Sequence, residues 1–390
     1  MNTNANTAAN ANTAAELPRG TLMIDVGGLE LDDGERERLR DPGVGGVILF
    51  ARNYADSGQL CALTAAIHAL RAPPLVIAVD HEGGRVQRFR GDGFTRLPAM
   101  RALGVLWERD HVAAMEAAHA AGYVLAAELA AHGVDLSFAP VLDLDHGRSR
   151  AIGSRAFHRD AAVVAALAQA LVAGMAEAGM GAVGKHFPGH GHVEADSHHD
   201  VPVDERAFAA IWDDDLAPYR HRLLRQLVGV MPAHVVYACA EPGEAGPAGF
   251  SRFWLREILR GRLGFEGVIF SDDLDMAGAR VAGDIVARAT AAGNAGCDML
   301  LVCNRPDLVA ELLARGLPEA DAARRARIAA LRVPAPRPWR ADPFALALHA
   351  PYLQACENVL AVAAMDDGDH APLAAETIGA TPPPDAPPRA

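Results

Sequence analysis

The sequence lacks several features that would place it in a class of protein at once. No segment is long and apolar enough to span a membrane. The first residues show neither the basic region nor the apolar region of a secretory signal. The five cysteines are odd in number, scattered, and include no CxxC pair. This pattern fits reduced thiols in a cytoplasmic protein better than a disulfide framework.

Positive charge is also scarce. The chain has 36 Lys and Arg against 49 Asp and Glu, which gives a net charge of -13. Such a balance argues against nucleic acid or an anionic membrane as the main partner. The 390 residues, 51% of them hydrophobic, suffice for one large domain or two small ones.

Short apolar runs alternate with longer segments of helical periodicity. The expected strands are residues 21–26, 46–50, 75–80, 135–143, 181–185, 228–234, 267–272 and 297–302. The expected helices are residues 57–70, 110–131, 160–178, 204–224, 251–263 with Ser251 as N-cap, 284–294 and 306–315.

This alternation predicts an α/β protein with a single closed (β/α)8 TIM barrel of parallel strands. A doubly wound open sheet is the alternative, and it would carry a Gly-rich phosphate loop after an early strand. Residues 25–29, DVGGL, do not match GxGxxG, so the open sheet ranks second.

The two ends of the chain differ in composition from the middle. Residues 1–18 begin with a low-complexity Asn, Thr and Ala tract, and we expect a disordered leader. Residues 19–340 form the predicted catalytic barrel, and 341–365 a C-terminal extension that can pack on it. Residues 366–390 are rich in Pro, Ala and acids, and we expect a disordered tail.

Polar side chains gather where the predicted strands end. Residues 185–199, KHFPGHGHVEADSHH, place a Lys, five His and two acids around a Pro-Gly kink. Other strand ends run into residues 80–88, DHEGGRVQR, into 152–157, into His234 and into 271–276, SDDLDM. Because the active site of a barrel lies at the carboxyl ends of its strands, we expect these segments to converge.

Taken together and in this order, the motifs resemble glycoside hydrolase family 3, in its β-N-acetylglucosaminidase branch, over roughly residues 20–335. The resemblance implies a single-domain barrel that removes terminal N-acetylglucosamine from peptidoglycan fragments. It is similar to the cytoplasmic cell-wall-recycling enzymes of Gram-negative bacteria. It further implies a small-molecule muropeptide substrate, a monomer, and no metal or organic cofactor.

The resemblance also assigns catalytic roles. Asp272 corresponds to the nucleophile of a retaining mechanism, with Asp273 and Asp275 as rival candidates. In an extended strand Asp273 faces away from Asp272, which favours a structural role for Asp273. His198, partnered by Asp196, corresponds to the proton donor and acceptor, a place that most glycosidases give to a carboxylic acid.

An imidazole suits acid and base work because it titrates at about 6.5, and a neighbouring carboxylate stabilises its protonated form. Gly189 and Gly191 lie in the same segment as His198. We therefore expect a flexible loop that closes over the bound sugar.

The remaining matches correspond to groups that bind the sugar. They are Asp80, Arg88, Arg155, Lys185 and His186. Glu82 and Arg85 fit a buried ion pair that holds the Gly83-Gly84 turn. His234 fits either a supporting role or an ordinary core position. His81 stands where Gln is common in this branch.

Three other readings stay open. A phosphorolytic N-acetylglucosaminidase is one, because an imidazole acid repels phosphate less than a carboxylate does. A metal-dependent hydrolase on the same barrel is another, since His190-Gly191-His192 superficially resembles an HxH metal motif. The third is a non-catalytic sugar-binding protein, because a fold does not dictate a function.

Overall fold

The structure is a computed structural model that describes residues 19–194, 197, 201–220, 222–243, 245–331 and 338–364. Asp196 and His198 lie outside the described residues, as do the expected leader 1–18 and tail 366–390. Among the residues that the structure describes, no helix combines the length and the apolar character needed to cross a membrane.

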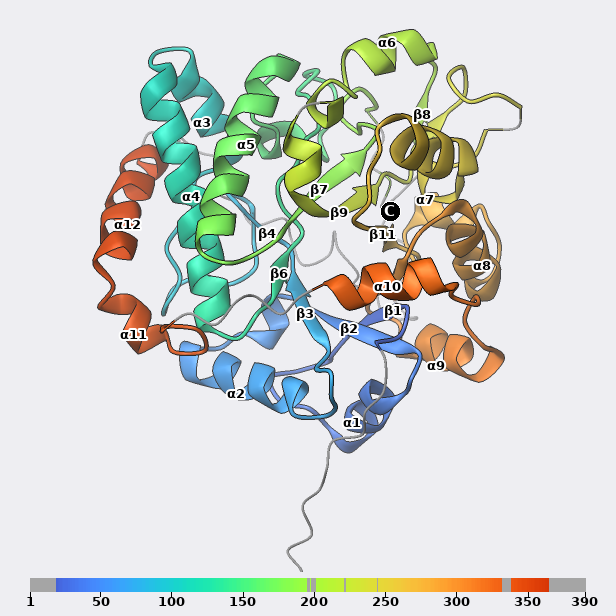
Figure 1. The fold of residues 1–390 in the computed structure, drawn as a ribbon, viewed down its shortest axis with the longest axis horizontal. Helices are drawn as coiled ribbons and strands as arrows, with labels where there is room; N and C mark the ends of the chain where they lie inside the picture. The colour runs from blue at the N-terminus through green and yellow to red at the C-terminus, as the bar shows by residue number, and fades with distance from the viewer. Residues whose placement is uncertain are drawn as a thin grey trace, which may run out of the picture.

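Within the described part of the chain, parallel strands close into a barrel in the order β1-β12-β11-β9-β7-β6-β3-β2 (Figure 1). Their bounds are β1 Leu22–Asp25, β2 Val44–Leu49, β3 Val76–Val79, β6 Leu136–Ser137, β7 Ala182–Phe187, β9 Leu227–Pro232, β11 Val268–Asp273 and β12 Met299–Val302. Each predicted strand contributes one barrel strand, in sequence order, so the (β/α)8 barrel is confirmed.

The barrel interior is filled by side chains that alternate along the strands, as the period of two requires. One apolar cluster collects Met23, Ile48, Phe138, Phe270 and Leu301 with other inward residues. Glycines make room for the largest of them. A Cβ on Gly229 would stand 2.6 Å from the Phe270 ring, and one on Gly46 would stand 2.5 Å from Met23 Cε. The interior is therefore packed, and ligands meet the barrel at its rim.

Helices surround the strands. They are α1 Asp33–Arg40, α2 Ser57–His68, α3 Met100–Trp107, α4 His111–Ala131, α5 Ala161–Glu177, α6 Phe208–Asp213, α7 Ala277–Arg280, α8 Ile285–Ala295, α9 Pro306–Arg315, α10 Ala322–Ala330, α11 Pro343–Ala347 and α12 Ala350–Ala363. Asp110, Asp160 and Asp284 cap α4, α5 and α8 by accepting backbone N–H bonds of the first turn.

Two predicted elements are less than half as long in the structure as in the sequence pattern. The strand expected over 135–143 is reduced to β6, because Pro140 has no N–H to donate to a ladder. The helix expected over 204–224 forms only as α6, and Pro218 begins a separate 3-10 turn. The segment over 251–263 is helical as expected, wound as a π-helix over Phe253–Arg262, and Ser251 Oγ accepts from the amide of Trp254 at 3.1 Å.

Two short strand pairs in the described part of the chain lie outside the barrel. β4 (His81–Gly83) pairs antiparallel with β5 (Val86–Gln87), and β8 (Val203–Asp204) pairs parallel with β10 (Val236–Tyr237). The first pair directly follows β3 and carries the segment that begins with Asp80.

The C-terminal helices lie against one side of the barrel's helical layer. α12 runs alongside α4 and also touches α3 (Figure 1, red and teal ribbons). Ala355, Val359 and Val362 are the buried residues of α12. Residues 338–364 are thus part of the folded body.

Candidate active site

The carboxyl ends of several barrel strands meet around Cys303, the residue that follows β12. Burial raises the pKa of this thiol well above its usual value, and the nearby charges of Asp273, Asp25, Asp80 and Asp272 raise it further. These carboxylates come from the ends of β1, β3 and β11. The rim therefore gathers acids from strands far apart in the sequence, as the barrel geometry predicts.

A buried ion network occupies the rim beside β3 and β7. Lys185 Nζ lies 2.6 Å from Asp80 Oδ1 and 2.6 Å from Glu82 Oε1. Arg155 binds Glu82 through two parallel bonds of 2.8 Å each. Asp80, Arg155 and Lys185, three of the expected sugar ligands, are thus brought together, and Glu82 is their common partner.

Glu82 is the centre of this network. Burial would raise the pKa of Glu82, but Arg155 and Lys185 hold it well below its usual range. Burial would lower the pKa of Arg155, and Glu82 raises it above its ordinary value. The predicted ion pair between Glu82 and Arg85 is therefore wrong. Arg85 Nη2 instead donates to the carbonyls of residues 150–152.

Arg88 lies beside Asp80 at the same rim, and two of its nitrogens make no hydrogen bond to a described residue. Its Nη2 lies 3.9 Å from Asp80 Oδ2, which is longer than a hydrogen bond. Nε and Nη2 of Arg88 are buried, and neither has a hydrogen-bond partner among the described residues. A buried donor without a partner costs free energy, so these atoms are suited to a ligand that brings oxygen acceptors.

His186 is oriented by Asp143. His186 Nδ1 lies 2.7 Å from Asp143 Oδ2, and Asp143 Oδ1 accepts from the amides of His186 and His190. Burial alone would raise the pKa of Asp143, but the two histidines hold it below its usual value. Asp143 therefore stays ionised and holds the proton on Nδ1, which leaves Nε2 of His186 for a ligand.

The end of β11 separates two adjacent acids. Asp272 Oδ1 accepts from the amide of Asp273 at 2.8 Å. Asp273 Oδ1 turns the other way and accepts from the amides of Asp275 and Cys303. Burial raises the pKa of Asp273 to about 7; the two amides oppose this shift, and the charge of Asp272 adds to it. The hydrogen bonds of Asp273 to the backbone agree with the structural role expected for a side chain that points away from that of Asp272 along the strand.

His234 supports the same strand end. Its side chain is fully buried, and Nε2 contacts the carbonyl of Asp273 at 3.1 Å. His234 is therefore a supporting residue under β11.

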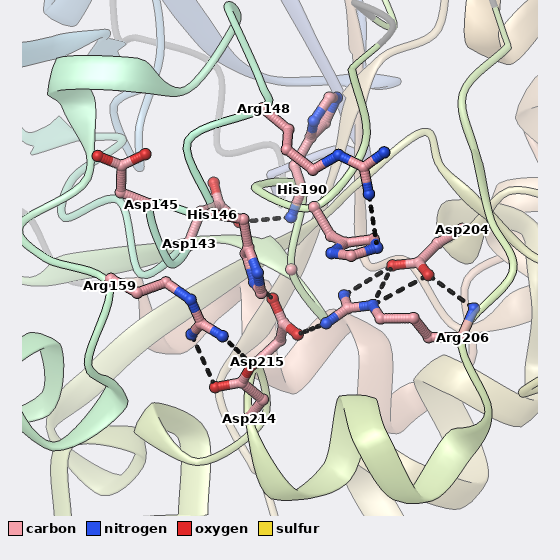
Figure 2. A network of polar contacts seen from close by, with 12 residues as sticks. Asp143, Asp145, His146, Arg148, Arg159, His190, Asp204, Arg206, Asp214 and Asp215 are labelled. Atoms are coloured by element: carbon pink, nitrogen blue, oxygen red, sulfur yellow. Dashed lines mark hydrogen bonds and ion pairs between the residues drawn. The ribbon is translucent and has the colours of Figure 1, made fainter.

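A second polar network lies under the segment that follows β7 (Figure 2). Asp215 is fully buried and contacts His146 Nε2 at 3.0 Å and Arg206 Nη1 at 2.6 Å. Arg206 also pairs with Asp204 at 2.7 Å. A Cβ on Gly189 would stand 2.7 Å from the side chain of Asp215. This glycine therefore lets the backbone rest directly on the network.

Only one residue between 195 and 200 is described. Ser197 is buried; its carbonyl accepts from the amide of Gly278 at 3.0 Å, and its Oγ lies 3.1 Å from His190 Nε2. The assigned acid/base pair, Asp196 and His198, lies outside the described residues.

One group of described side chains has the spacing of a metal site. Ligand atoms of His146, Asp214 and Asp215 lie within 4.8 Å of one another. Asp215 is already paired with Arg206, which it shares with Asp204, and Asp214 is paired with Nη1 and Nη2 of Arg159. Protein cations therefore already bind both carboxylates.

Two residues of this site were missed from the sequence. The sequence predicts only a structural ion pair for Glu82 and only the end of a strand for Asp143. An acid at the carboxyl end of a predicted barrel strand was the available signal for Asp143. For Glu82 the spacing of DHEGG gives no sign of its partners, Arg155 in a 3-10 turn and Lys185 on β7.

Comparisons with known proteins agree with this geometry. Residues 19–331 match the glycosyl hydrolase family 3 N-terminal domain. A β-hexosaminidase of Aromatoleum aromaticum is 70% identical over 346 residues, which cover 89% of this chain and 96% of that protein. The crystal structure of native NagZ from Neisseria gonorrhoeae superposes with a TM-score of 0.83 at 48% identity, covering 89% of this chain and 99% of that one.

A second structure of the Neisseria gonorrhoeae protein, in complex with N-trifluoroacetyl-D-glucosamine, superposes with a TM-score of 0.82 at 48% identity, over 89% of this chain and 99% of that one. The match to the family domain, the barrel and the relatives at this identity lead to one assignment. The chain belongs to glycosyl hydrolase family 3, within its β-N-acetylhexosaminidases.

Proposed function

We propose that the protein is a retaining exo-β-N-acetylglucosaminidase that cleaves terminal N-acetylglucosamine from peptidoglycan fragments, including N-acetylglucosaminyl-1,6-anhydro-N-acetylmuramic acid and its peptides. The main support is Arg88: its buried Nε and Nη2 have no hydrogen-bond partner among the described residues, and Nη2 lies 3.9 Å from Asp80 Oδ2. The binding of an N-acylated glucosamine by the Neisseria gonorrhoeae relative supports the sugar class.

In this proposal the rim network binds the sugar. Asp80 accepts hydrogen bonds from ring hydroxyls, and its side chain is the most exposed of the network at 20%. Arg88, Lys185 and His186 supply donors to hydroxyl and acetamide oxygens. Arg155 completes the set by holding Glu82, and through it Lys185, in place.

The proposed chemistry has two steps. Asp272 attacks the anomeric carbon while the glycosidic bond breaks and His198 gives its proton to the leaving oxygen. Water then attacks the glycosyl-Asp272 ester, and His198 takes the water proton as the bond to Asp272 breaks. Asp196 orients the imidazole and stabilises its charged form. The group transferred is N-acetylglucosamine, released with its β configuration, and no cofactor takes part.

The cellular setting is part of the proposal. We propose a monomeric cytoplasmic enzyme that acts on muropeptides during cell-wall recycling, as the resemblance of the sequence motifs to such enzymes of Gram-negative bacteria implies.

Trapping of the intermediate tests the proposal. A 5-fluoro-N-acetylglucosaminyl donor should label the wild type, and peptide mapping should place the sugar on Asp272. Asp273→Asn should still be labelled, whereas Asp272→Ala should lose label and nearly all turnover, on the order of several powers of ten. Label on Asp273, or near-normal activity of Asp272→Ala, would overturn the assignment.

The same preparation separates hydrolysis from phosphorolysis. Turnover with and without phosphate should be equal, and proton NMR should show the β anomer of free N-acetylglucosamine first. A phosphate-dependent rate with sugar-1-phosphate as product would replace hydrolysis by phosphorolysis, and loss of activity with a chelator would favour the metal-dependent alternative.

A further inference from the structure

The side chain of Gln87 bridges the loop that carries Arg88. Gln87 Nε2 donates to the carbonyls of Phe89 and Thr95 at 3.1 and 2.8 Å. Gln87 Oε1 accepts from the amide of Leu97 at 3.0 Å. Arg88 therefore projects from a loop whose two ends are tied by its neighbour in the chain.

The far side of this loop is tied to α4. The amide of Thr95 donates to both oxygens of Glu128, at 2.9 and 3.0 Å. Glu128 is fully buried. A buried carboxylate with specific donors holds its partner firmly, because losing the bonds would leave the acid unsatisfied.

The C-terminal helix completes this contact. Tyr352 Oη donates to Glu128 Oε1 at 2.7 Å, and Cys356 Sγ lies 3.5 Å from Thr95 Oγ1. Both residues belong to α12, which lies beyond the family domain at residues 19–331. The polar contacts therefore run from α12 through α4 to the loop of Arg88.

We infer that Tyr352 is a positioning residue for the sugar site: it fixes Glu128, Glu128 fixes Thr95, and the tied loop places Arg88 opposite Asp80. This inference rests on the proposed role of Arg88 in sugar binding. The C-terminal extension thereby sets affinity for the sugar without touching it.

The electrostatics of Glu128 support this route. Burial raises the pKa of Glu128 to about 7, and the bonds from Thr95 and Tyr352 oppose that shift. Removing the tyrosine hydroxyl removes one donor and favours the protonated acid, which is a weaker acceptor for the amide of Thr95. The loop should then be held less firmly.

The test is Tyr352→Phe, which keeps the ring and deletes only the hydroxyl. With an aryl N-acetyl-β-glucosaminide well below the melting temperature, KM and the inhibition constant of N-acetylglucosamine should rise, on the order of three- to tenfold. The kcat should stay within about twofold, because the reacting groups are unchanged.

The matched control is Tyr123→Phe. Tyr123 Oη lies 3.4 Å from His349 Nδ1 and so also joins α4 to the C-terminal segment, through His349 instead of through Glu128. This control should leave KM unchanged. Equal changes of KM in the two variants, or a lowered melting temperature with KM unchanged in Tyr352→Phe, would show that α12 only stabilises the fold.

A double-variant cycle separates this inference from the proposed function. If Tyr352 acts through Arg88, Tyr352→Phe should add little to the KM of Arg88→Ala. Effects that multiply would overturn the route through Arg88. If Arg88→Ala itself leaves KM unchanged, the sugar-binding role of Arg88 fails and the inference fails with it, while the nucleophile assignment is unaffected.

Discussion

The buried His81 should make the protein lose stability in mild acid. Its side chain is fully buried beside Phe89 and Phe94, with ring centroids 5.9 and 5.6 Å apart from theirs. Neither ring nitrogen has a hydrogen-bond partner among the described residues. Burial lowers the pKa of His81 to about 3, and the positive charges of Arg88, Arg90 and His132 act in the same direction.

The direction and size of this change in the free energy of unfolding follow from proton linkage. Below about pH 6.5 the unfolded chain takes up a proton on His81, whereas the folded chain stays neutral until about pH 3. The unfolded state binds more protons in this window, so stability falls as the pH falls. Between pH 7.5 and pH 5 the loss assigned to this residue is about 2 kcal/mol.

Urea denaturation of the wild type and of His81→Gln at both pH values measures this loss. Gln has a similar volume and does not titrate, so the variant should lose about 2 kcal/mol less than the wild type over this interval. Glu128 and Asp273 are present in both proteins, so their titration cancels in the difference. His111→Gln, at an exposed position, should behave as the wild type. Equal pH dependence in wild type and His81→Gln would refute the reasoning.

Three further predictions follow from the site and the termini. Glu82→Gln should lower the free energy of unfolding by about 3 kcal/mol, read from the urea midpoint, because it unbalances a buried ion network. His198→Ala should steepen the dependence of log kcat/KM on leaving-group pKa across aryl glycosides, with Asp196→Ala milder; a slope no steeper than wild type would remove His198 from the acid role. Chains lacking residues 1–16 or 366–390 should keep melting temperature and turnover, since these compositions cannot bury a core; a drop in either would contradict this.

The barrel could be predicted because most of its strands contain a short apolar run that is buried on both faces. Such a run is visible in the sequence alone, as at residues 44–49 and 268–270. Their carboxyl ends share one rim in any parallel barrel, so the meeting of Asp80 and Lys185 followed from strand order alone. The ion pair of 2.6 Å between them agrees with that expectation.

Partner choice within the site could not be predicted in the same way. Proximity in the chain favours Arg85 as the partner of Glu82. In the structure Glu82 bonds to Arg155, which is 73 residues away. The tie from Tyr352 to Glu128 spans 224 residues and leaves no periodic signal in the sequence. The spacing of apolar residues along the chain predicts the helices and strands. Which side chains pair across them depends on how those helices and strands pack.

The glycines of the segment after β7 show how one residue type supports opposite conclusions. Gly189 and Gly191 suggested flexibility, because glycine has the widest choice of backbone angles. A Cβ on Gly191 would stand 1.8 Å from the carbonyl oxygen of Leu144, and the carbonyl of Gly189 accepts from Tyr237 Oη at 2.8 Å. At these two positions the absence of a side chain allows close packing, which restrains the backbone. The start of this segment is therefore held against Leu144 and Tyr237 by packing and a hydrogen bond.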